Sequence, residues 1–228
     1  MSVAMASSRV CGVLFDLDGT LLDSAPDLYA ALQVQCAEEG VAPPPYEMVR
    51  AVVSRGATAV LRCAFAARGD AGLAALLPRY LKLYEGLMAE HTRACAGVEQ
   101  LLGRIEARGW AWGTVTNKAG FLTHELLRRI GWAERAAAVV AGDTLPVKKP
   151  DPAPVLLACR HAGIAAADAV FVGDDQRDVQ AGMRAGLTTV AAAWGYLDGG
   201  DPRSWGADVV CDSPARLGEW LRLEAVPT

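Results

Sequence analysis

Short apolar runs alternate with amphipathic stretches along most of this chain, as expected for strands that take turns with helices. The first apolar run covers residues 10–15 and predicts a buried strand. Later apolar runs predict strands at 110–115, 137–141, 169–172, 187–192 and 207–211. A last helix is predicted at 214–223. Such alternation is typical of a parallel sheet with helices on both faces. The sequence therefore predicts an α/β fold with a doubly wound, Rossmann-like parallel sheet.

Residues 23–95 show a different pattern. Apolar positions recur there at helical spacing, and no strand is expected. Ser24, with Asp27 three residues later, predicts a helix start of the capping-box type. We therefore expect an all-helical cap domain at 23–95, inserted into an α/β core domain made of residues 1–22 and 96–228.

Composition narrows the class of protein. The 228 residues are 52% hydrophobic and carry a net charge of −4, with a pI near 5.4. Nucleic acid and membrane surfaces need a basic face, so neither is expected as a partner. Residues 1–9 have no long apolar segment and no later run could span a bilayer, which predicts a cytoplasmic protein. The six dispersed cysteines predict buried thiols. We expect the protein to be a monomer or a homodimer.

Two carboxylates stand directly after the first predicted strand. Asp16 and Asp18 are separated by one residue, and Gly19 then lets the chain turn sharply. On extended backbone this spacing can point both side chains into the same space. Two like charges that close share a proton or are held by a cation, so the stretch indicates a metal site. The alternative is that an acidic pair followed by glycine only marks the exit from a strand.

Further polar groups follow other predicted strands or stand in the loop just after them. These are Thr116 with Asn117, Lys149, and Asp174 with Asp175. Each has a plain explanation by itself: the end of a strand, a solvated lysine, or the cap of a helix. The carboxyl ends of strands in a doubly wound sheet share one edge, however, so their common position predicts one crevice with a metal site and an anion site.

These motifs resemble a known family. The sequence is similar to the haloacid dehalogenase superfamily of phosphohydrolases over essentially its whole length. The four signature positions of that family are occupied here by Asp16-Leu17-Asp18-Gly19-Thr20, Thr116, Lys149-Pro150 and Gly173-Asp174-x-x-x-Asp178. The helical insert stands where the family places a four-helix cap.

The resemblance implies a set of catalytic residues. Asp16 would be the nucleophile, which takes the phosphoryl group as an aspartyl-phosphate. Asp18 would protonate the leaving oxygen and afterwards activate water. Lys149 would neutralise the transferring oxygens, and Thr116, with the backbone at Asn117, would orient them.

The resemblance also implies Mg²⁺ as cofactor. Asp16, Asp174 and the backbone carbonyl of Asp18 would hold the ion, with Asp178 or Asp175 acting through water. The ion would cancel the repulsion between an anionic nucleophile and an anionic phosphate. The expected activity is therefore Mg²⁺-dependent hydrolysis of a small phosphate ester.

Other reaction classes of similar proteins can be compared with this expectation residue by residue. Dehalogenases of the superfamily lack an acid at the place of Asp18, because a halide needs no proton. Phosphosugar mutases keep both aspartates, so the motifs leave that class open. A receiver-type signalling module also has acidic residues, Thr and Lys at strand ends, but the helical insert and the aspartate on the first strand speak against it.

The substrate is inferred by resemblance to the phosphoglycolate-phosphatase-like branch. Within that branch the chain looks closest to N-acetylmuramic acid 6-phosphate phosphatases of peptidoglycan recycling. Asp175 favours this narrower interpretation, since phosphoglycolate phosphatases commonly have a small hydroxyl residue there.

Both candidate substrates carry a carboxylate besides the phosphate. Arg55, in a loop of the predicted cap, offers a guanidinium suited to bind it, and its alternative is an exposed arginine on a loop. Gly56 either allows close approach of backbone to substrate or only breaks the helix. The predicted substrate-binding residues are Arg55, Gly56, Asn117 and Lys118.

Overall fold

A six-stranded parallel sheet forms the centre of the computed structural model, which describes residues 10–223; the prediction for 1–9 lies outside them. The strand order is β5-β4-β1-β6-β7-β8, and all neighbouring pairs are parallel. The strands are β1 (Gly12–Phe15), β4 (Ala111–Val115), β5 (Ala138–Val140), β6 (Ala169–Gly173), β7 (Thr188–Ala192) and β8 (Val209–Cys211). The predicted α/β fold with a doubly wound sheet is confirmed.

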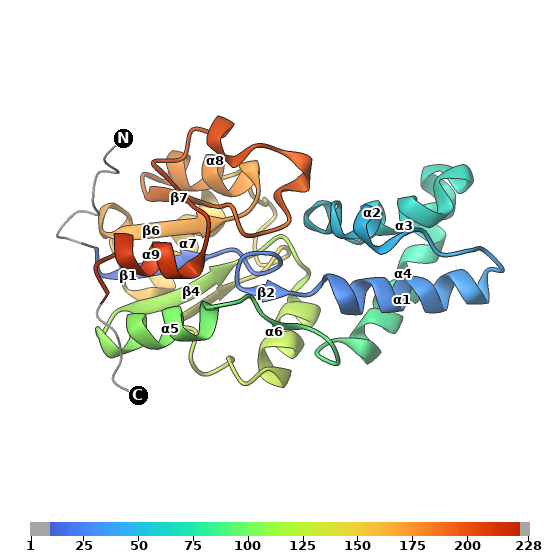
Figure 1. Cartoon of the computed structure of the whole chain (residues 1–228), viewed down its shortest axis with the longest axis horizontal. Coiled ribbons are helices and arrows are strands. Elements are labelled where there is room, and N and C mark those ends of the chain that lie inside the picture. Colours follow the sequence, from blue (N-terminus) through green and yellow to red (C-terminus); the bar gives the residue numbers. More distant parts are fainter. Residues whose placement is uncertain (1–9, 224–228) are drawn as a thin grey trace.

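Helices cover both faces of this sheet (Figure 1). Along β1, Val13 and Phe15 belong to one hydrophobic core and Leu14 to the other, so the strand is apolar throughout because both its faces are buried. One core includes residues of α5, α6 and α9, and the other includes residues of α7 and α8. These helices are α5 (Val98–Ala107), α6 (Gly120–Arg129), α7 (Ala153–Ala162), α8 (Gln176–Ala185) and α9 (Pro214–Trp220).

Four further α-helices lie beyond one end of the sheet (Figure 1). α4 packs against both α1 and α3, and α2 packs against α1. The helices are α1 (Ala25–Glu38), α2 (Tyr46–Arg50), α3 (Ala57–Phe65) and α4 (Gly69–Leu87), with the short 3₁₀ turn η1 (Val53–Arg55) between α2 and α3. Among the described residues, no helix is sufficiently long and apolar to cross a membrane.

The insert leaves and rejoins the sheet through two short antiparallel strands. β2 (Leu22–Asp23) pairs with β3 (Arg93–Ala94). The expectation of no strand in 23–95 is therefore wrong near both ends of that range, at Asp23 and at Arg93–Ala94, because a strand of two residues is too short to show an alternating pattern. The division into a core domain and a cap domain stays a prediction.

The start of α1 also differs from the expectation. Ser24 makes no capping hydrogen bond through its side chain. Asp27 instead accepts hydrogen bonds from the amides of His91 and Thr92, at 2.8 and 3.0 Å, and from the Thr92 hydroxyl at 2.6 Å. The predicted capping box is thus wrong, since the Asp27 carboxylate fastens the returning chain to α1.

Candidate active site

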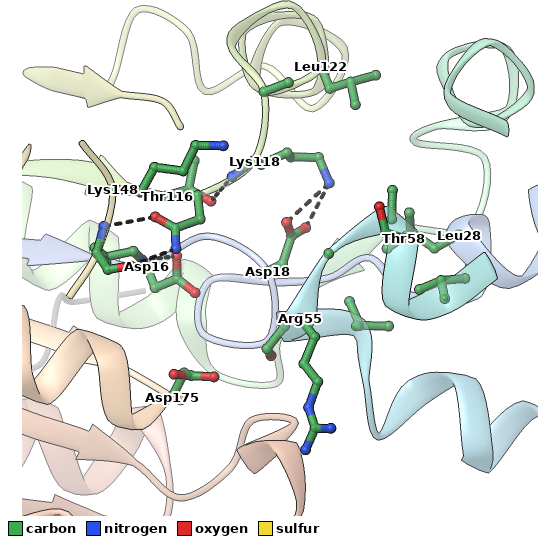
Figure 2. Close-up of a pocket in the computed structure, with 18 of the residues that line it drawn as sticks. Asp16, Asp18, Leu28, Arg55, Thr58, Thr116, Lys118, Leu122, Lys148 and Asp175 are labelled. Atoms are coloured by element: carbon green, nitrogen blue, oxygen red, sulfur yellow. Dashed lines mark hydrogen bonds and ion pairs between the residues drawn. The ribbon is translucent and has the colours of Figure 1, made fainter. Parts of the chain in front are cut away.

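A cavity of about 420 Å³ lies between the carboxyl ends of the strands and the helical insert (Figure 2). Residues from sequence-distant loops of the sheet line one side, and they include Asp16, Asp18, Thr116, Asn117, Lys118, Lys149 and Asp178. The other side is mostly apolar and comes from the insert. We call this side the insert wall and define it as Leu28, Val60, Leu77, Leu81 and Tyr84. Arg55 and Gly56 also line the cavity.

Lys149 is buried among three acceptors. Its Nζ donates to Asp16 Oδ1 at 2.6 Å and to the Val115 carbonyl at 2.7 Å, and it lies 2.7 Å from Asp178 Oδ1. Burial opposes the charged form, but the Asp16 and Asp178 carboxylates outweigh it and raise the pKa of Lys149. The lysine is therefore a fixed ammonium that points at Asp16.

Asn117 holds the backbone of this lysine. Its Nδ2 donates to the Lys149 carbonyl and its Oδ1 accepts from the Lys149 amide, both at 3.1 Å. Neighbouring Thr116 is buried, and its hydroxyl oxygen accepts the Lys118 amide at 3.2 Å. The Asn117 side chain thus positions Lys149, a contact for which the sequence contains no local signal.

Three buried aspartates form a compact group that we call the carboxylate cluster. Asp16, Asp174 and Asp178 each offer one oxygen, and these oxygens all lie within 4.8 Å of one another. Asp174 accepts from the Thr20 hydroxyl at 2.9 Å and from the Tyr196 amide at 2.7 Å. Sequence reasoning found the three aspartates but neither of these two donors.

The electrostatics of the carboxylate cluster fit a bound cation. Burial raises the pKa of Asp16, of Asp174 and of Asp178, the last to about 7, and the charge of Asp16 raises those of the other two further. One ammonium, Lys149, cannot offset three carboxylates. Clustered carboxylate oxygens are the donors that hard divalent cations prefer. Gly19, with φ +88°, makes room here, because a Cβ at that position would lie 2.2 Å from Asp174 Oδ2.

Asp18 stands apart from this cluster and is held by two side chains. Lys118 Nζ lies 3.1 Å from both carboxylate oxygens, as the dashed lines of Figure 2 show. The Ser24 hydroxyl donates to Asp18 Oδ1 at 2.5 Å. The Lys118 ammonium also lies 4.6 Å from the centre of the Tyr84 ring. Lys118, predicted to bind substrate, is thus paired with Asp18 in the structure.

Asp175 is the N-cap of α8. Its side chain accepts from the Arg177 amide at 2.8 Å, while Asp178 accepts from the Asp175 amide at 3.1 Å, which completes a capping box. Arg177 also forms an ion pair with Asp175 and donates to the Ser54 carbonyl of the insert at 2.7 Å. The helix-cap explanation therefore applies to Asp175, whereas Asp178 serves both the cap and the carboxylate cluster.

Arg55 reaches outward from the cavity. Its Nε donates to both carboxylate oxygens of Asp198, at 2.6 and 2.8 Å, and Figure 2 shows the guanidinium pointing away from Asp18. Gly56 has φ +86°, a conformation that favours glycine, and a Cβ there would have no neighbour within 4 Å. A role of Arg55 and Gly56 in substrate binding stays a prediction.

Fold and site together match a known class of enzyme. Residues 13–192 match the family model of haloacid dehalogenase-like hydrolases. The match covers most of the chain, and the protein belongs to this family.

Individual relatives are similar over nearly their whole length. A phosphoglycolate phosphatase of Xanthomonas campestris pv. campestris (strain 8004) is 46% identical over 208 residues, which cover 91% of this chain and 94% of the relative. An N-acetylmuramic acid 6-phosphate phosphatase of Pseudomonas aeruginosa is 41% identical over 215 residues, or 93% and 95% of the two chains. Together with the family match, these relatives support a phosphatase.

A solved structure shares the fold. The crystal structure of a predicted phosphoglycolate phosphatase from Haemophilus somnus 129PT superimposes with a TM-score of 0.84 at 24% identity, over 94% of this chain and 99% of that one.

Proposed function

We propose that this protein hydrolyses phosphate monoesters through an aspartyl-phosphate on Asp16. The observation that supports the proposal most is the position of the Asp16 carboxylate. It lines the cavity, 2.6 Å from the Lys149 ammonium and within the carboxylate cluster. A carboxylate in that position can attack phosphorus while a cation offsets the charge of the incoming phosphate.

The reaction proceeds in two displacements. In the first, an Asp16 oxygen forms a bond to phosphorus, the bond from phosphorus to the ester oxygen breaks, and that oxygen takes a proton from Asp18. In the second, water attacks phosphorus, Asp18 takes the water proton, and the bond from phosphorus to Asp16 breaks. The products are the alcohol and inorganic phosphate, and both aspartates return to their initial states.

Other residues of the cavity hold the ester in place. The Lys149 ammonium neutralises the transferring oxygens, and the Thr116 hydroxyl orients them. Lys118 moves from Asp18 to an anionic oxygen of the ester, which frees Asp18 for proton transfer. We include this movement because Lys118 Nζ lies 3.1 Å from both Asp18 oxygens, and an Asp18 oxygen must face the leaving oxygen, and later water, to exchange a proton with it.

Mg²⁺ is the proposed cofactor. Asp16, Asp174 and the backbone carbonyl of Asp18 would hold it, with Asp178 acting through water. When bound, the ion supplies positive charge that offsets the repulsion between the Asp16 carboxylate and the phosphate.

The proposed substrate is a small sugar phosphate or carboxylated phosphate ester. Phosphoglycolate and N-acetylmuramic acid 6-phosphate are the candidates suggested by the names of the relatives. The cavity of about 420 Å³ favours the larger one, because a two-carbon acid leaves most of that volume unfilled. We further propose that residues 23–95 act as a cap, whose insert wall contacts the organic part of the substrate.

A screen of phosphate release tests the proposal. Phosphoglycolate, N-acetylmuramic acid 6-phosphate, hexose phosphates and nucleotides would be incubated with the protein, with and without Mg²⁺. We expect inorganic phosphate as product, in excess over enzyme and only with the metal. An isomerised sugar phosphate without free phosphate would instead indicate a mutase, and a single turnover would indicate a phosphoacceptor module.

Substitution of the nucleophile provides the matched test. Asp16→Asn keeps the size of the side chain but removes its charge, so we expect kcat to fall by about 10³-fold or more while the circular dichroism spectrum is unchanged. Substantial remaining turnover in Asp16→Asn would remove the nucleophile assignment.

A further inference from the structure

The amino end of α1 is capped by a tyrosine that is far away in the sequence. The phenol oxygen of Tyr196 accepts the amides of Ser24 and Ala25 at 2.8 and 2.9 Å, and its hydroxyl donates to Asp23 Oδ1 at 2.8 Å. Amides at the start of a helix have no partner within the helix and need an external acceptor. Tyr196, in the loop after β7, supplies this acceptor.

Capping is ordinarily the task of a serine at the position of Ser24. The oxygen of such a serine accepts an amide from the first turn of its own helix. Here Ser24 has no such bond, and its hydroxyl donates to Asp18 instead. Tyr196 accepts the amide of Ser24 itself and that of Ala25, and so fixes the Ser24 backbone from which the hydroxyl donates to Asp18.

Tyr196 is itself fixed from several sides. Its side chain is buried, and its own amide donates to Asp174 Oδ2 at 2.7 Å. The guanidinium of Arg50, from α2, lies 4.9 Å from the centre of its ring. The phenol therefore has a defined place relative to both the carboxylate cluster and the first helix of the insert.

We propose that Tyr196 is a positioning residue for Asp18, acting through Ser24. By accepting the amides of Ser24 and Ala25, it fixes the Ser24 backbone, keeps the Ser24 hydroxyl on Asp18 and so holds that carboxyl group where the leaving oxygen arrives. This proposal rests on the proposed function, in which Asp18 transfers the proton. It gives Tyr196 a role that lies beyond the packing of the loop after β7.

The test compares two leaving groups in the same enzyme preparation. A nitrophenolate leaves readily without a proton, whereas a sugar alkoxide needs one, so a misplaced Asp18 slows the alkyl ester more than the aryl ester. For Tyr196→Phe we expect kcat for the sugar phosphate to fall about tenfold, and kcat for nitrophenyl phosphate to change much less. Partial unfolding cancels in this ratio, because it lowers both rates equally.

Further variants test whether the effect passes through the contact between Ser24 and Asp18. Ser24→Ala should change the ratio as Tyr196→Phe does, and the double variant should be no worse than either single variant, because both break the same path. Ser24→Thr keeps a hydroxyl and should restore most of the ratio. Tyr80→Phe is the control: it removes another buried phenol, which donates to the Leu28 carbonyl at 2.9 Å, and should leave the ratio unchanged.

The opposing results are equally clear. Equal loss on both substrates in Tyr196→Phe, or multiplicative losses in the double variant, would overturn the positioning role. If Tyr196→Phe does not fold, Ser24→Ala carries the test, because it removes the hydroxyl through which Tyr196 acts, and an unchanged ratio in Ser24→Ala would overturn the proposal. Failure of the proposed function would appear in the unsubstituted chain, which would release no phosphate from either ester.

Discussion

The two sides of the cavity are built in opposite ways. The side from the sheet consists of polar and charged groups with fixed partners, as in the contacts of the buried Lys149 with Asp16 and Asp178. The insert wall consists of side chains from α1, α3 and α4 that are apolar except for the phenol of Tyr84. From this difference we propose that the sheet supplies the chemistry and the insert selects the substrate. Substitutions on the two sides should therefore change different kinetic constants.

Removal of the metal should have the largest effect on the side from the sheet. We expect a chelator to abolish phosphate release and added Mg²⁺ to restore it, because the carboxylate cluster repels an anionic substrate when no cation is bound.

Binding of Mg²⁺ can be measured independently of activity. Mg²⁺ should raise the melting temperature of the protein, since a ligand that binds the folded state stabilises it. Asp174→Asn should remove most of that rise. A melting temperature that does not respond to Mg²⁺ in the unsubstituted protein would contradict the metal site.

Loss of the buried ammonium should be the next largest effect. Lys149→Met keeps the length of the side chain but removes the charge, and we expect kcat to fall by about 10²- to 10³-fold. Lys82→Met, at an exposed position on α4, is the matched control and should leave kcat unchanged. A Lys149→Met variant that changes only KM would contradict the role of this lysine in the transition state.

The smallest effect is expected at the edge of the insert. We expect Arg55→Ala to raise KM for carboxylated esters by about a few-fold and to leave kcat unchanged, as is typical for a residue that contributes only to binding. Asp198→Ala should have the opposite effect on KM, because it releases the Arg55 guanidinium from its present partner. If KM is unaltered in both variants, Arg55 is only an exposed arginine on a loop.

The sequence predicted the side from the sheet much better than the insert wall. Asp16, Thr116 and Asp174 follow β1, β4 and β6 directly, and the shared edge of a parallel sheet brings such positions together whatever the details of packing. No comparable rule predicts which residues form the insert wall, because their contacts depend on how the four helices of the insert pack against one another.

Contacts between side chains that are far apart in the sequence could not be predicted from the sequence. Ser24 was interpreted as a helix cap, because the pattern of the first turn is typical of one and nothing local reveals that Tyr196 accepts the amides of Ser24 and Ala25. One signal was present: Gly19 turns the chain, and its amide donates to the Leu22 carbonyl at 2.7 Å, so the chain folds back and brings Ser24 near Asp18. The pairing of Arg177 with the Ser54 carbonyl had no signal at all.

The most direct test of the central claim is to trap the covalent enzyme. The protein would be mixed with an ester that carries a radiolabelled phosphoryl group, quenched in acid within one turnover, and digested for mass spectrometry. We predict a phosphoryl group on Asp16 that disappears on a chase with unlabelled ester and is absent from Asp16→Asn. Label on another residue, or phosphate release with no labelled protein at any time during the turnover, would contradict the account.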